Sequence, residues 1–261
     1  MIRNKRKRYS GEIFDINNED VLEKLEKNER GIVFIDLVET ANYHEASLSD
    51  DARQIIQGTN AGGNSEISEA ISYEIFYRYG AELVMTEKEI EELLKGGPLV
   101  DYVCKIYSIV VAVSVTRVMK KNEKDLKKKI KEKLDGIAAA TKKHEKDFPD
   151  DSKWERKILH VFVQYKETVK KVSEAVTQLL EENGYDTLAV ISKAEGLPFI
   201  FSNDINELQS PKHKASEGAS STSEARKTQK RKAQEQETPQ KQSPKRQKQS
   251  PKKTKKQKTK K

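Results

Sequence analysis

Apolar residues recur at helical spacing in three parts of the chain. They repeat every three or four residues over 65–79, 123–146 and 167–182, which predicts three amphipathic helices. The repeating positions of the first helix are Ile67, Ile71 and Ile75. Asn122 is the expected N-cap of the second helix, whose many lysines are expected to face water beside the apolar stripe.

Short segments rich in Val, Ile and Tyr predict strands between these helices. The segments are 83–85, 99–107, 109–119, 158–163 and 188–192. Only Ser108 separates the second segment from the third, so these two are expected to pair as an antiparallel hairpin. The third is apolar on both faces at its start, as in a central strand. The last strand–helix–strand unit predicts a parallel pair. Residues 65–208 should therefore form an α/β domain with a mixed β-sheet flanked by helices.

The first 64 residues carry weaker signals. A short helix is expected near 20–28, and the apolar segment 32–35 follows it. Residues 47–64 are turn-like, and their glycines are not a phosphate loop because no Gly-Lys-Ser/Thr follows them. We therefore expect residues 1–64 to be a partly ordered N-terminal extension.

Charge divides the chain near residue 209. Residues 209–261 hold 18 Lys and Arg against 4 Asp and Glu, a net charge of +14, which leaves 32 against 38 and a net −6 for residues 1–208. Beyond Leu208 the only hydrophobic residue type is Ala, so this segment cannot bury enough apolar surface to offset its conformational entropy. We expect a disordered basic tail after an acidic domain.

The basic clusters of this tail predict a nuclear location. Their spacing resembles bipartite signals that bind a nuclear import receptor, and such clusters also bind DNA or RNA without sequence preference by neutralising phosphates. The residues concerned are Arg226, Lys227, Lys230, Arg231, Lys232, Lys245, Arg246, Lys252 and Lys253.

Cysteine and hydropathy limit the remaining possibilities. Cys104 is the single cysteine of the chain, so neither an intramolecular disulfide nor a cysteine-cluster metal site can form. The longest apolar run, 109–113, is far shorter than the roughly 18 residues of a membrane span. We therefore expect a protein of a reducing compartment with no membrane partner.

The order of the predicted elements resembles a known nuclease fold. With Asp101 at the start of the second strand, the order matches the αβββαβ core of the PD-(D/E)xK nuclease-like, or restriction-endonuclease-like, superfamily. The segments 65–70 and 113–117, Ser-Glu-Ile-Ser-Glu-Ala and Val-Ser-Val-Thr-Arg, are similar to those of a poorly characterised eukaryotic group with a degenerate motif. In the superfamily, a strand Asp and a Glu two residues before a Lys hold one or two divalent metal ions, and a helix Glu often joins them.

This resemblance implies a set of candidate site residues. Asp101 matches the strand Asp, and Glu69 or Glu66 matches the helix acid, so Asp101 and Glu69 would bind Mg²⁺ if the site is active. Ser114 falls where the motif has Glu, and Thr116 falls where it has Lys. Neither supplies charge, so the cation would have to come from Arg117 or Lys105. Side chains alternate along a strand, so Arg117 should face away from Ser114 and Thr116.

Three functional classes stay open on these residues. The domain is a divalent-metal-dependent nuclease, a catalytically degenerate nuclease-like module that binds nucleic acid, or a nuclear scaffold without nucleic-acid chemistry. The two hydroxyl residues of the motif favour the second class over the first. Glu66 and Glu69 also have a simpler interpretation as solvated acids in the first turn of a helix. The histidines show no metal-ligand spacing.

Overall fold

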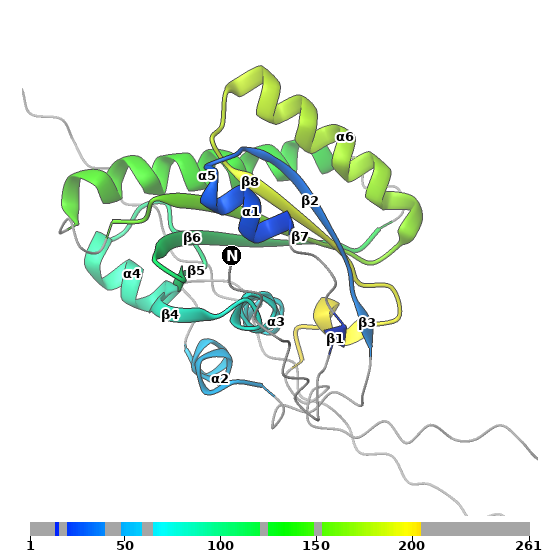
Figure 1. Cartoon of the computed structure of the whole chain (residues 1–261), viewed down its shortest axis with the longest axis horizontal. Helices are drawn as coiled ribbons and strands as arrows, with labels where there is room; N and C mark the ends of the chain where they lie inside the picture. Colours follow the sequence, from blue (N-terminus) through cyan, green and yellow to red (C-terminus); the bar gives the residue numbers. More distant parts are fainter. Residues whose placement is uncertain are drawn as a thin grey trace, which may run out of the picture. The chain divides into compact units, whose positions relative to one another are not determined.

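The computed structural model describes residues 14–15, 20–39, 48–58, 65–120, 125–148 and 153–204, and most of its strands form one six-stranded sheet (Figure 1). The order across the sheet is β2 (Gly31–Asp36), β8 (Leu188–Lys193), β7 (Arg156–Val163), β6 (Ile109–Val118), β5 (Tyr102–Ile106) and β4 (Ala81–Thr86). The pairs from β2 to β6 are parallel, and the two remaining pairs are antiparallel. The predicted α/β fold with a mixed sheet is confirmed.

Helices cover both faces of this sheet (Figure 1). One face packs against α1 (Asp20–Glu26), α3 (Glu66–Tyr77) and the 3-10 helix η3 (Pro198–Phe201), and α2 (Asp50–Gln57) packs on α3. The other face packs against α4 (Glu87–Leu94), α5 (Leu126–Asp147) and α6 (Lys166–Asn183). Two apolar cores therefore lie on opposite sides of one sheet.

The central position of β6 follows from its sequence. Val111, Val113 and Val115 point into the core beneath α3, whereas Ala112 and Val118 point into the core beneath α5. The predicted hairpin is confirmed, since Ile106 of β5 lies opposite Ile109 of β6. The first strand of the hairpin begins at Tyr102 rather than at the predicted residue 99, a few residues after the Gly96-Gly97-Pro98 turn. Tyr107 lies in the tight link between the two strands and has a positive φ of 54°, which such a link requires.

The part of the chain before residue 65 contributes directly to this architecture. Its apolar segment forms β2, which pairs with β8 and extends the sheet beyond the predicted 65–208 domain. A parallel strand is normally buried by neighbours, and β2 supplies that neighbour for β8. The two short strands β1 (Phe14–Asp15) and β3 (Val38–Glu39) form a separate antiparallel pair.

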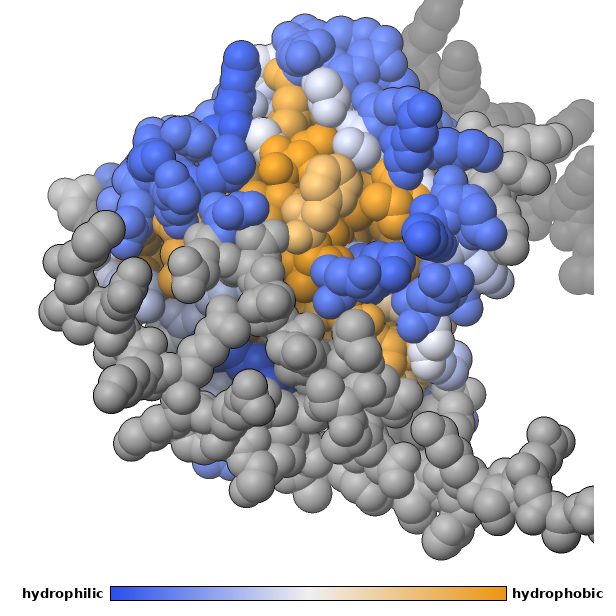
Figure 2. Space-filling model, turned by 45° about the vertical axis from the view of Figure 1, so that its right-hand side comes forward, coloured by the Kyte–Doolittle hydropathy of each residue, from blue (hydrophilic) through white to orange (hydrophobic). Residues whose placement is uncertain are grey.

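The side of the molecule that Figure 2 brings forward shows apolar side chains framed by hydrophilic ones.

Several expectations fall on residues that the structure does not describe. Asn122, the expected N-cap of α5, is one of them, and the described helix begins at Leu126 after Asp125. The basic tail and its nine predicted nucleic-acid-binding residues also lie outside the described residues. Among the helices that are described, none combines the length and hydropathy of a membrane-spanning segment.

Candidate functional site

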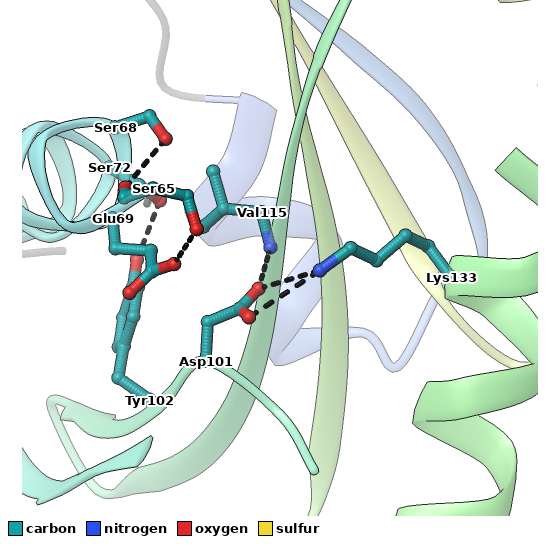
Figure 3. Close-up of polar contacts among 8 residues, drawn as sticks. All are labelled: Ser65, Ser68, Glu69, Ser72, Asp101, Tyr102, Val115 and Lys133. Carbon is teal, nitrogen blue, oxygen red and sulfur yellow. Dashed lines mark hydrogen bonds and ion pairs between the residues drawn. The ribbon is translucent and has the colours of Figure 1, made fainter. Parts of the chain in front are cut away.

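Two acidic side chains from different elements lie near each other where β5 begins, Glu69 directed at Ser65 and Asp101 at Val115 and Lys133 (Figure 3). Glu69 comes from the first turn of α3, and Asp101 is the residue directly before β5. Pairing between β5 and β6 starts at Tyr102 opposite Val113, whereas β6 continues to Val118. Asp101 therefore lies beside the part of β6 that runs past the beginning of β5.

Backbone hydrogen bonds and one lysine hold Asp101 in place. Its backbone N–H donates to the carbonyl of Val113 at 3.0 Å, and its Oδ2 accepts the N–H of Val115. Lys133 of α5 places Nζ at 3.4 Å from each carboxylate oxygen. This distance is longer than the roughly 2.8 Å of a close charge-assisted hydrogen bond, so the ammonium compensates the charge without being tightly bound. Asp101 is 8% exposed.

Glu69 is more deeply buried and incompletely hydrogen-bonded. It is 2% exposed, its Oε1 accepts the hydroxyl of Ser65 at 2.5 Å, and its Oε2 is buried without a hydrogen-bond partner. Burial raises the pKa of Glu69 to about 8, and the negative charge of Asp101 contributes to the increase. Glu69 is therefore not a solvated first-turn acid, and it retains a proton near neutral pH unless a cation replaces it.

Arg117 lies on the α3 side of the sheet, as the alternation of side chains along β6 predicts. Its guanidinium donates to the carbonyl of Ser202 at 3.0 Å and to Oδ1 of Asn203 at 2.7 Å. Burial lowers the pKa of Arg117, while the charges of Glu69 and Glu66 oppose that shift. The arginine is thus a positive group on the same side as Glu69, anchored to the segment that follows η3.

Ser114 and Thr116 lie on the other side of the sheet. Both are buried, and their positions in β6 alternate with Val113 and Val115, which places them on the face covered by α5. They add hydroxyls but no charge. Lys105, another candidate cation, is exposed near the opposite end of β5. Of the predicted catalytic set, the structure brings together Glu69 and Asp101, with Arg117 on the Glu69 side.

Lys133 was not singled out by the sequence. It belongs to a helix segment with many lysines, most of which are exposed. Lys129 and Lys133, one turn apart, are half-buried instead, and Lys129 donates to the carbonyl of Arg117 at 2.7 Å. Both directly precede residues of the buried stripe, Ile130 and Leu134. This position at the border of the stripe was the available signal that these two lysines reach toward the sheet.

Two buried carboxylates, Glu69 and Asp101, are the groups of this site that would be available to a divalent cation. No group of three or more His, Cys, Asp or Glu side chains suited to a metal ion occurs among the described residues. Mg²⁺ is commonly held by one or two carboxylates together with water and substrate phosphates. Glu69 and Asp101 supply two carboxylates, and the unpartnered Oε2 of Glu69 is a buried acceptor that a cation would satisfy.

Comparison with known proteins gives one distant similarity. No protein-family model matches the chain. No solved structure matches it. A curated protein of Dictyostelium discoideum described as "AAC-rich mRNA clone AAC4 protein" is 27% identical over 169 residues, which cover 59% of this chain and 24% of that protein. The similar region is thus part of this chain and about a quarter of that longer protein, whose name states no activity.

Proposed function

We propose that this chain is a nuclear, nucleic-acid-associated protein whose nuclease-like domain binds a phosphodiester through a divalent cation and cleaves it slowly or not at all. The observation that carries the proposal is the pair of buried carboxylates, Glu69 and Asp101, which lie near enough for the charge of Asp101 to raise the pKa of Glu69, with Lys133 Nζ at 3.4 Å from Asp101. Buried, paired titratable groups with shifted pKa values occur preferentially at functional sites.

Like charge is the reason that the pair favours a cation. Two carboxylates at one buried position cannot both ionise without a compensating charge. The raised pKa of Glu69 means that the second charge is now neutralised by a proton. A divalent ion would displace this proton and neutralise both side chains, so binding should release close to one proton below pH 8.

A bound phosphate would complete the coordination of such an ion. Two carboxylates leave several positions of Mg²⁺ open, and phosphate oxygens are its usual additional ligands. The acidic domain repels nucleic acid at long range, with a net charge of −6 over residues 1–208, whereas the +14 of residues 209–261 attracts it. We infer that the tail provides most of the affinity and that the cation makes the local contact.

The loss of charged residues on β6 is the reason to expect weak or absent cleavage. Where the related nucleases carry a Glu and a Lys, this chain has Ser114 and Thr116, which cannot share the charge of a metal ion or stabilise an attacking hydroxide. Glu69 and Asp101 would be the two carboxylates that hold the ion, and positioning of water would be left to groups outside that motif.

An active metal-dependent nuclease is the second candidate, and Lys133 is the observation that favours it. Its ammonium is loosely paired with Asp101 and its side chain is 37% exposed, so it could approach a water molecule or a phosphate oxygen. In that case a lysine from α5 would replace the missing lysine of β6. A nuclear scaffold without nucleic-acid chemistry is the third candidate.

Cation binding tests the site itself. We expect calorimetric titration of the full chain with Mn²⁺ to show one site, with affinity rising about tenfold per pH unit between pH 6 and 8 because one proton is released. Glu69→Gln and Asp101→Asn should abolish this binding. Asp135→Asn, which alters an exposed carboxylate of α5, is the matched control and should bind normally. Binding that is unaffected by the first two variants would exclude the proposed site.

Nucleic-acid assays separate the three candidates. The full chain and residues 1–208 would be incubated with single- and double-stranded DNA and RNA, with Mg²⁺, Mn²⁺ or a chelator. We expect cation-stimulated binding that is lost in Asp101→Asn, and a smaller salt dependence without the tail. Efficient cleavage that requires Asp101 and Lys133 would favour the nuclease. No binding would favour the scaffold.

Cellular location tests the remaining part of the proposal. The full chain and residues 1–208 would be expressed as fusions to a fluorescent protein large enough to prevent passive entry into the nucleus. We expect nuclear accumulation of the full chain and its loss without the tail, because the basic clusters of residues 226–253 are the proposed contacts for an import receptor. Equal nuclear accumulation of both fusions would contradict this role of the tail.

A further inference from the structure

Four buried polar side chains form a continuous hydrogen-bonded chain across the sheet beneath α3. The Ser72 hydroxyl lies 2.7 Å from the Tyr102 hydroxyl and 2.7 Å from Nδ1 of His160. Nε2 of His160 lies 2.7 Å from the hydroxyl of Ser192. All four side chains are fully buried. These residues connect α3 to β5, β7 and β8, and together they are called the Ser72 chain below.

The protons of the Ser72 chain can satisfy every link. Burial lowers the pKa of His160 to about 3, so its ring is neutral and carries one N–H. If Nε2 donates to Ser192, then Nδ1 accepts from Ser72, which in turn accepts from Tyr102. In the other tautomer, Nδ1 of His160 donates to Ser72, Ser72 donates to Tyr102, and Ser192 donates to Nε2 of His160. Either direction leaves each contact with one donor and one acceptor.

Stability alone gives little reason for such a chain in the core. A satisfied buried hydrogen bond adds only modestly to net stability, and well-packed apolar side chains of similar shape often serve equally well. Buried polar networks differ from apolar contacts in their directionality, since they tolerate only one arrangement of the elements they join. The rings around the chain also pack in defined orientations, with Tyr73 edge-on to Tyr102 and Phe76 edge-on to His160.

The Ser72 chain joins the same two segments that carry the acidic pair. Ser72 lies three residues after Glu69 on α3, and Tyr102 directly follows Asp101 (Figure 3). Repulsion between Glu69 and Asp101, when both are ionised, acts to separate the first turn of α3 from the beginning of β5. The Ser72–Tyr102 hydrogen bond opposes that separation one helical turn away, and His160 fixes Ser72 to the centre of the sheet.

We propose that the Ser72 chain positions Glu69 against Asp101, so that both carboxylates reach the same cation. This role rests on the cation site proposed above. Ser72 and Tyr102 are positioning residues, because they contact each other and not the ion. Removal of a contact that orients a metal ligand without touching the ion commonly lowers metal affinity by a factor of about 10 to 100.

The first test measures Glu69 without any metal. The titration of its carboxyl would be followed by carbon-13 NMR in the full chain, in Ser72→Ala and in Tyr102→Phe. If the Ser72 chain holds α3 against the beginning of β5, the Glu69 midpoint should fall in both variants, because Glu69 becomes less buried and Asp101 moves away. An unchanged midpoint in both folded variants would overturn the proposal. This result does not depend on whether the protein binds a cation.

The second test measures Mn²⁺ affinity with a matched control. Thr141→Val also removes one buried hydroxyl with two contacts, since Thr141 donates to the carbonyl of Ile137 and accepts from Trp154 Nε1 on the other side of the sheet. We expect Ser72→Ala and Tyr102→Phe each to weaken Mn²⁺ binding about tenfold, and the double variant to lose no more than Ser72→Ala, because both variants remove the Ser72–Tyr102 hydrogen bond. Thr141→Val should lower the melting temperature comparably and bind Mn²⁺ normally.

The outcomes distinguish this proposal from the proposed function. Wild-type protein that binds no Mn²⁺ would contradict the cation site, while the NMR titration would still decide the positioning role. Equal loss of Mn²⁺ affinity in Thr141→Val would overturn the positioning role and assign the effect to general loosening of the fold.

Discussion

On the α3 side of the sheet, the helix that contacts the strands is itself covered by α2, whereas on the other side α5 and α6 face water along their outer surfaces. Residues 67–76 of α3 are all buried, and they include Ser68, Glu69, Ser72 and Glu74. In α5 the corresponding polar side chains are mostly exposed lysines and acids. The buried polar groups of α3 therefore cannot obtain hydrogen bonds from water, whereas the exposed polar groups of α5 can.

A fully buried helix must satisfy its polar groups within the protein. Glu74 accepts the N–H of Ser49 at 2.9 Å and thereby fixes the beginning of α2, and Ser72 has its partners in the sheet. Glu69 is the exception, with one oxygen unpartnered. The buried polar groups of α3 thus include the carboxylates of Glu69 and Glu74, whereas Ser114, Thr116 and Thr141 bury hydroxyl groups on the α5 side.

The largest effect is expected from Glu69→Gln. The folded-state pKa of Glu69, about 8, lies above the usual value of 4.5, so the folded protein binds the extra proton between these values and its stability falls as pH rises from 4.5 to 8. The glutamine variant should lack this slope. At pH 8 it should be more stable by on the order of 4 kcal/mol, as measured by urea denaturation at several pH values. If the free energy of unfolding changed with pH in the same way in both proteins, the raised pKa of Glu69 would be contradicted.

Apolar packing on the opposite face predicts a smaller and pH-independent effect. Leu134 is fully buried in the core beneath α5. Leu134→Ala should reduce the free energy of unfolding by about 3 kcal/mol at every pH from 5 to 8, because it removes buried methyl groups and leaves a cavity. Mn²⁺ binding measured well below the melting temperature should be retained. If the loss of unfolding free energy in Leu134→Ala varied with pH, packing on the α5 face would be coupled to the protonation of Glu69 on the α3 face.

The smallest expected effect concerns the start of α4, which lies on the same face as α5. The Thr86 hydroxyl accepts the N–H of Glu89, and the Glu89 carboxylate accepts the N–H of Thr86, which forms a capping box. Thr86→Ala should lower stability by about 1 kcal/mol, observed as a modest decrease in the denaturation midpoint without a change in its slope. Thr86→Ser retains the hydroxyl and should remain close to the wild type.

Much of the fold was accessible from local patterns. The helical repeat of Ile67, Ile71 and Ile75 correctly predicted α3. The valine-rich strand β6 was correctly assigned to the centre of the sheet. The contribution of β2 was harder to predict, because its parallel partner β8 lies more than 150 residues later in the sequence and no local signal specifies such a pairing.

Only part of the candidate site was accessible in the same way. The resemblance to a nuclease family indicated Glu69 and Asp101, and strand alternation separated Arg117 from Ser114 and Thr116. Lys133 was missed because its position directly before Leu134, at the border of the buried stripe, does not say which group of the sheet the lysine reaches until the helix is placed against the sheet. The Ser72 chain was missed for the same reason, since a hydrogen bond between α3 and β7 joins residues 88 positions apart.

By itself, the sequence determined the positions of the helices and strands from residue 65 onward, the division between an acidic domain and a basic tail, and the absence of a disulfide within the chain. These properties depend on composition and on periodicity over a few residues. Tertiary structure alone decided which carboxylate is buried, which lysine compensates it and which polar groups are joined. Burial and charge compensation depend on neighbours that are distant in sequence, and the same glutamate on an exposed helix would keep its ordinary pKa.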